Sequence, residues 1–156
     1  MTAGDLPVKN LFEAASAERV KERISQLRPD SKRLWGKMDV AQALAHCAAA
    51  MEWAVGLQFP PRRLAGLLFG RFAKMMIVNE IPMPRNSMTD KKLLVKDARD
   101  FEVERQRLRA LIDRFVTAGP AGCTTHPHSL FGKLTPTEWA ALMYQHLDHH
   151  LRQFQV

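Results

Sequence analysis

The sequence contains only two cysteines, Cys47 and Cys123, in 156 residues. Their wide spacing excludes a disulfide framework and a paired-cysteine zinc knuckle. The sequence also has no apolar run that approaches the roughly 20 residues of a membrane-spanning helix. The first ten residues, MTAGDLPVKN, lack the basic-then-apolar order of a secretory signal. We therefore expect a soluble protein that resides in the cytoplasm.

Positive charge predominates, but it is not concentrated in one place. The chain has 23 Lys and Arg against 16 Asp and Glu, a net charge of +7. This balance permits binding to nucleic acid, an anionic membrane or a negatively charged small molecule. The basic residues are spread from Lys9 to Arg152, and no nucleic-acid-binding motif accompanies them. We expect a small-molecule substrate, and neither nucleic acid nor a membrane as a partner.

Alternating strand patterns are scarce, whereas apolar residues recur at three- and four-residue steps, so the fold class should be all-α. Helices are expected over residues 10–27, 39–57, 62–78, 98–117 and 135–154. Four long helices and a shorter one indicate a four-helix bundle that forms one domain over residues 1–156. Residues 79–97 should form a long crossing connection with little regular structure, because prolines and turn formers interrupt them.

Two of these helices have clear start signals. Asp39 followed by Gln42 is an Asp-based capping box, and Thr135 with Glu138 is a second one with proline at the first helical position. The helix over 62–78 has apolar residues on one side and basic residues available on the other. Such a helix can lie on a membrane, but we expect it to pack against the core with a solvated basic face.

Three of the six histidines lie in the stretch YQHLDHHLRQF, residues 144–154. His146 and His150 are one helical turn apart, so their side chains lie about 6 Å from each other on one side of the helix. That side also carries apolar residues, and the two rings should face the protein interior. His149 falls on the flank and is not expected to be a ligand.

A third ligand is available in the second helix, where His46 lies on a stripe with Ala43, Ala50 and Trp53. Small neighbours leave space for a metal and for a molecule bound to it. The alternative for His46 is a buried histidine whose ring bonds to a backbone carbonyl. With His146 and His150 at the other end of the chain, we interpret the three histidines as one metal site.

The pair is not a zincin motif, because Leu147 stands where HExxH has its general base. Three imidazoles with open coordination positions are typical of catalytic metal sites. Such a site could take Zn²⁺, Ni²⁺, Fe²⁺ or Mn²⁺.

A histidine in the second helix, followed about a hundred residues later by HLDHHLRQ in the last one, resembles the DinB/YfiT-like superfamily of metal-binding four-helix bundles. The phrases RLWGKMDVAQALAHC and FGKLTPTEWAALMYQHLDHHLRQF are similar to an uncharacterised bacterial branch with a C-terminal HxxHHxxQF motif, and the similarity covers nearly the whole chain. One departure is Leu-Arg-Gln at 151–153, where the superfamily often has Arg-Gly-Gln.

The resemblance implies an up-down-down-up bundle with a long crossover. It also implies that His46, His146 and His150 are the metal ligands, with Gln153 supporting one of them. Some branches use the metal to activate the thiol of a low-molecular-weight cofactor for transfer or isomerisation, and others are hydrolase-like. This branch has no activity to carry over.

Two functions are therefore open. The first is a metal-dependent S-transferase or hydrolase that activates a thiol or water, with His149, Gln153, His126 or His128 assisting proton transfer. The second is a non-catalytic bundle that binds a ligand, or pairs with itself or another protein as a homodimer or complex. In that case residues 62–76, RRLAGLLFGRFAKMM, are the candidate surface.

Overall fold

The computed structural model of the protein describes residues 8–87 and 89–156. Within these residues the structure is all-helical and has no strand, which confirms the all-α prediction. The elements are α1 (Ala14–Gln26), α2 (Val40–Ala54), α3 (Leu64–Val78), η1 (Lys91–Leu93), α4 (Phe101–Ala118), η2 (Pro120–Gly122) and α5 (Pro136–Gln153). No helix in the described part of the chain is long and apolar enough to cross a membrane. The residues 1–7 used for the secretory-signal prediction lie outside the described range.

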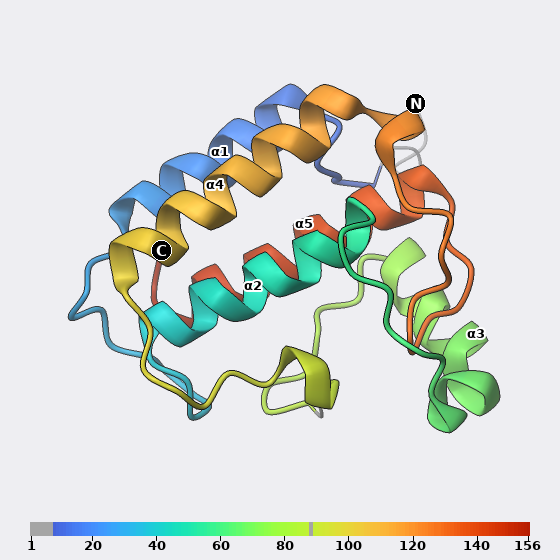
Figure 1. The fold of residues 1–156 in the computed structure, drawn as a ribbon, viewed down its shortest axis with the longest axis horizontal. Helices are drawn as coiled ribbons and strands as arrows, with labels where there is room; N and C mark the ends of the chain where they lie inside the picture. Colours follow the sequence, from blue (N-terminus) through green and yellow to red (C-terminus); the bar gives the residue numbers. More distant parts are fainter. Residues whose placement is uncertain (1–7, 88) are drawn as a thin grey trace, which may run out of the picture.

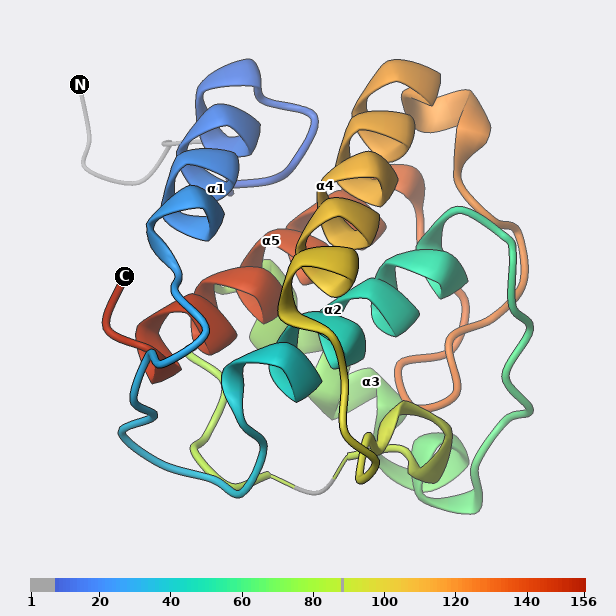
Figure 2. The same ribbon diagram turned by 60° about the vertical axis from the view of Figure 1, so that its left-hand side comes forward.

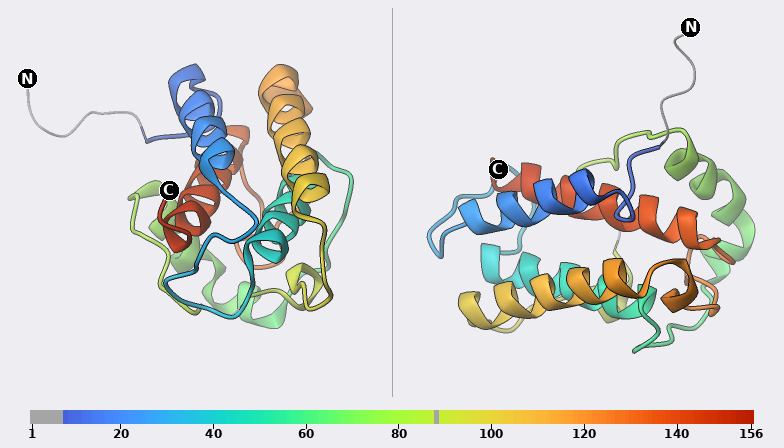
Figure 3. Two further views of the ribbon diagram at one scale, coloured as in Figure 1. Left: turned by 90° about the vertical axis from the view of Figure 1, so that its left-hand side faces the viewer. Right: turned by 90° about the horizontal axis from the view of Figure 1, so that it is seen from above.

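Helices α1, α2, α4 and α5 pack side by side around one apolar core (Figure 1). Helix α1 lies beside α5, and α2 lies beside α4 (Figure 3). The chain runs in one direction through α1 and α5 and in the opposite direction through α2 and α4 (Figures 1 and 2). The largest fully buried apolar side chains come from these helices and the segment before α1, and they are Leu11, Val20, Ile24, Met51, Leu108, Ile112, Phe115, Trp139 and Leu147.

Both predicted capping boxes are present. The Asp39 side chain accepts from the Gln42 backbone N–H, and the Gln42 side chain accepts from the Asp39 backbone. Thr135 and Glu138 make the same reciprocal pair at the start of α5. Helix α1 begins at residue 14 instead of 10. Its start was harder to predict, because no side chain caps it.

The connection between α3 and α4 is mostly irregular, as predicted, but it contains the short η1 helix. The Asp90 side chain accepts from the Lys92 backbone and starts this turn. Asp90 is also paired with Arg63, at 2.7 Å between Oδ2 and Nε. Leu93 at the end of the turn is buried, so η1 fixes part of the crossover against α2.

The prediction that α3 packs its apolar side against the core is wrong. Helix α3 lies outside the group of four helices, against α5 (Figures 1 and 2). Its buried residues are Gly66, Gly70 and Ile77. Its larger apolar side chains point outward, and Leu68 and Phe72 are 69% and 65% exposed. The physical reason is that the two glycines allow the close approach to the loop after residue 128, so the glycine side faces inward.

Candidate metal centre

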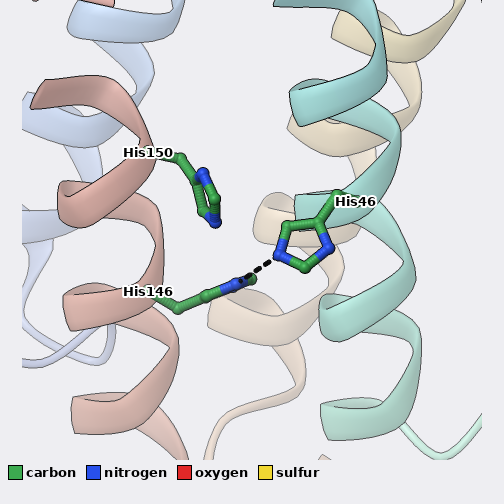
Figure 4. A group of neighbouring side chains, drawn as sticks. All are labelled: His46, His146 and His150. Carbon is green, nitrogen blue, oxygen red and sulfur yellow. Dashed lines mark hydrogen bonds between the residues drawn. The ribbon is translucent and has the colours of Figure 1, made fainter. Parts of the chain in front are cut away.

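Three histidines meet between α2 and α5 (Figure 4). His46 comes from the middle of α2, and His146 and His150 come from successive turns of α5. One nitrogen of each ring lies within 4.8 Å of a nitrogen of each of the others. The Nε2 atoms of His46 and His146 are 2.8 Å apart. The three histidines singled out in the sequence are therefore close together, as expected.

The orientation of His46 is set by the crossover. Its Nδ1 lies 2.9 Å from the backbone carbonyl oxygen of Leu93. A carbonyl oxygen only accepts, so Nδ1 carries the proton and the lone pair of neutral His46 is on Nε2, which faces His146. This backbone partner could not be predicted from the sequence, because every residue has a backbone carbonyl.

The orientation of His150 is set by Gln153. The Nδ1–H of His150 donates to Oε1 of Gln153 at 2.8 Å, and Nε2 of Gln153 donates to the carbonyl of Trp35 at 2.7 Å. Because Nε2 of Gln153 must donate to Trp35, Oε1 is the atom that faces His150, and it requires the proton of the neutral ring to be on Nδ1. Nε2 of His150 is therefore unprotonated and free to bind an ion. Gly36 makes room for this arrangement, since at φ 79° an added Cβ would lie 2.6 Å from Nε2 of Gln153. Gln153 is where the resemblance placed a supporting group.

His46 is buried and His146 and His150 are half-buried, and their loss of contact with water keeps the three rings neutral. Desolvation is the main cause that lowers the pKa of His46, His146 and His150, and the neighbouring rings lower it further. The pKa of His150 falls to about 3. Neutral imidazole is the form that binds a metal. At neutral pH the lone pairs of His46 and His150 are on Nε2, whereas His146 donates its Nε2–H to Nε2 of His46 at 2.8 Å and must move that proton to Nδ1 before its Nε2 can bind an ion.

The donor set fits a divalent transition metal. Imidazole nitrogens that bind an ion at about 2.0–2.1 Å lie roughly 3.0–3.4 Å from one another. The observed separations, from 2.8 Å to at most 4.8 Å, bracket that range. Small rotations of the side chains would bring all three to one ion. Three protein ligands leave further coordination positions for a water or a substrate.

The remaining histidines have different surroundings. His149 lies beside the cluster, with its ring centroid 5.1 Å from that of His150 and 5.5 Å from that of Trp35. His126 bonds to the carbonyl of Pro60. Nδ1 of His128 accepts from two backbone amides of its own loop, so this ring orders the loop and is not directed at the cluster.

Neither cysteine belongs to the centre. Cys47 follows His46 in sequence but is buried on the core side of α2, and desolvation raises the pKa of its thiol. Cys123 lies after η2, and burial raises the pKa of its thiol to about 11. Both thiols therefore stay protonated at neutral pH and are poor metal ligands. Within the described residues the metal-competent group contains His46, His146 and His150 and no carboxylate.

No curated protein and no solved structure matches this chain. A family match extends over residues 9–156 and so includes all three histidines of the cluster. The chain belongs to the family described as "Protein of unknown function (DUF1569)".

Proposed function

We propose that this protein is a divalent-metal-dependent enzyme in which His46, His146 and His150 hold the metal through Nε2. The observation that carries the proposal is the fixed tautomer of two rings. The carbonyl of Leu93 and the amide of Gln153 engage Nδ1 of His46 and His150, so both Nε2 lone pairs face the common centre. Histidines that only filled space in the core would have no reason to direct both Nε2 lone pairs at one point.

We also propose that the architecture is that of the DinB/YfiT-like superfamily. Its support is the direction of the four packed helices, with α1 and α5 parallel and α2 and α4 opposed to them (Figure 1). The long connection from residue 55 to 100 carries α3 and joins two parallel helices. This order supports the proposed up-down-down-up arrangement with a crossover.

The reaction we propose is thiol transfer or hydrolysis in the cytoplasm. A divalent ion held by three imidazoles lowers the pKa of a bound water or thiol into the neutral range. Among the nearby residues, His149 is the proposed proton acceptor. Burial is the main cause that lowers its pKa, so the ring is neutral at pH 7, and it contacts His150 directly. Gln153 is not available for this role, because both ends of its amide are engaged.

Metal content tests the proposal first. The protein is purified without a nickel column and analysed for bound elements, and its affinity for Zn²⁺, Ni²⁺, Fe²⁺ and Mn²⁺ is measured by calorimetry. We expect one ion per chain with a dissociation constant of about 1 μM or lower. The double change His146→Ala, His150→Ala should abolish this binding. His126→Ala is the matched control, because it removes a histidine outside the cluster.

Thiol coordination separates the two reaction types. Cobalt-loaded protein is titrated with a low-molecular-weight thiol, and a sulfur-to-cobalt charge-transfer band is expected if a thiol reaches an open position. Absence of that band with intact metal binding would favour activation of water. A wild-type chain that binds no divalent ion would refute the metal-dependent function altogether.

A further inference from the structure

The outward side of α3 carries most of the exposed apolar surface. Of thirteen large apolar side chains that are exposed in the described residues, eight lie between residues 64 and 81. We call these eight the α3 apolar face, and they are Leu64, Leu67, Leu68, Phe69, Phe72, Met75, Val78 and Ile81. Scattered exposed apolar residues are normal on proteins, but a contiguous set of this size marks an interaction site.

The face has an ordered centre. Leu64, Leu68, Phe72 and Met75 recur at steps of four, four and three residues, which places them on one stripe along the whole helix. This stripe contains no charged residue. Arg71 lies next to the stripe, between it and Leu67 and Val78. Arginine is one of the residue types enriched in protein–protein interfaces, so its place within the α3 apolar face is compatible with such a contact.

The opposite side of α3 is fixed, so the helix cannot turn its apolar face inward. A Cβ added at Gly66 would lie 2.5 Å from the carbonyl oxygen of Ser129, and one at Gly70 would lie 2.6 Å from that of Leu130. Near the end of the helix, Nε2 of Gln145 donates to the carbonyl of Ile77 at 2.7 Å. These contacts hold the face in an orientation ready for a partner.

The area of the face matches a stable dimer. The eight side chains are between 45% and 74% exposed, and two of them are phenylalanines. Together they expose on the order of 700 Å² per copy, close to the roughly 800 Å² that one partner contributes to a standard interface. The largest apolar patch on a typical monomer is only about 300–600 Å².

Charge argues against a membrane as the occupant. Helices that lie on anionic membranes present free Lys and Arg beside the apolar side. Here Arg63 pairs with Asp90 and Lys74 pairs with Glu138, at 2.7 and 2.9 Å. Arg62 donates to the carbonyl of His128 at 2.8 Å. In the described structure, Arg71 is the basic residue of 62–78 for which no such contact is present.

We propose that the α3 apolar face is a homodimer interface, where it packs against the same face of a second copy of this chain around a two-fold axis. An uncharged stripe is complementary to itself, and a two-fold arrangement buries it on both copies in one closed contact. The proposal does not depend on metal binding, although α3 contacts the helix that carries His146 and His150.

Sedimentation equilibrium over a range of protein concentrations tests it. The wild-type chain of 17.7 kDa should sediment with twice that mass at micromolar concentration. The double change Leu68→Glu, Phe72→Glu places charges at the centre of the face and should weaken association at least 100-fold. Val103→Glu is the matched control, since Val103 is equally exposed but lies on α4, and it should remain a dimer.

Circular dichroism and metal affinity of the double variant should equal those of the wild type, which separates loss of the interface from loss of the fold. A wild-type chain that is monomeric at tens of micromolar would overturn the proposal. So would a double variant that remains a dimer. Cosedimentation of monomeric wild-type protein with phosphatidylglycerol vesicles would also overturn it and assign the face to a membrane.

Discussion

Helices α3 and α5 contact each other, yet they use their apolar residues in opposite ways. Helix α5 buries its large side chains and directs two histidines inward, whereas α3 buries two glycines and Ile77 and directs most of its large side chains outward. Both sequences show helical periodicity. The comparison teaches that periodicity identifies a helix and its apolar side but not what covers that side.

The sharpest test of the comparison truncates one leucine on each helix. Leu147→Ala in α5 removes a side chain that is 1% exposed, and it should lower the free energy of unfolding by about 2–5 kcal/mol. Leu68→Ala in α3 should change it by no more than about 0.5 kcal/mol, measured by denaturant unfolding at dilutions where the chain is monomeric. Equal losses at the two positions would mean that α3 packs inward.

A second test adds a methyl group on the inner side of α3. In Gly66→Ala the new Cβ meets backbone oxygens of the loop, which cannot move aside as a flexible side chain would. The free energy of unfolding should fall by about 1–3 kcal/mol, and α3 should become more sensitive to protease. Ala65→Leu, on the exposed side, is the control and should be nearly neutral. A stable Gly66→Ala variant would contradict the observed orientation.

The third test is on the histidine side of α5. Gln153→Ala removes the acceptor from Nδ1 of His150 and the donor to the Trp35 carbonyl. Metal affinity, measured by competition with a chromophoric chelator, should fall by about 10–100-fold. Gln106→Ala on the surface of α4 should leave it unchanged. An unaltered affinity in the Gln153 variant would show that this amide does not orient the ligand.

Acid should lower the free energy of unfolding over a defined pH range, because histidines on and near α5 are buried. Burial lowers the pKa of His150 to about 3 and that of His128 to about 4, against about 6.5 in the unfolded chain. Both rings stay neutral in the folded state, so above pH 6.5 they do not change the free energy of unfolding with pH. Below pH 6.5 the unfolded chain takes up protons that the folded chain does not, and the free energy of unfolding falls. Each group should remove about 1.4 kcal/mol per pH unit, until the pH reaches its folded pKa.

Chelator-treated protein should be used for this measurement, with denaturant unfolding at pH 7.0, 6.0 and 5.0. Because the protonated rings are disfavoured only in the folded state, the double change His146→Ala, His150→Ala should reduce the slope. A stability that is constant between pH 6.5 and 5 would mean that the rings are not buried in the way described.

The sequence predicted those features that depend on nearby residues. The start of α5 follows from Thr135, Pro136 and Glu138, which act within one turn, and the structure has the helix there. The proximity of His146 and His150 follows from helix geometry alone. Their proximity to His46 required a prediction that distant helices pack together, and the structure agrees with it.

The features that could not be predicted involve backbone groups and long-range contacts. Nothing in the identity of Leu93 or Trp35 shows that its carbonyl will accept a bond from the site. The orientation of α3 depends on a close contact between Gly66 and the loop at 129–130, which is far away in sequence. Glycine signals conformational freedom or close approach, but it does not identify the neighbouring segment.

The bond between His46 and the Leu93 carbonyl has a consequence for how this centre tolerates evolutionary change. Every residue type offers the same main-chain oxygen, so drift at position 93 preserves the acceptor as long as the short η1 turn keeps its path. Selection would then act on the shape of the crossover. Related chains would then keep an identical tautomer at this histidine while showing no shared side chain to account for it.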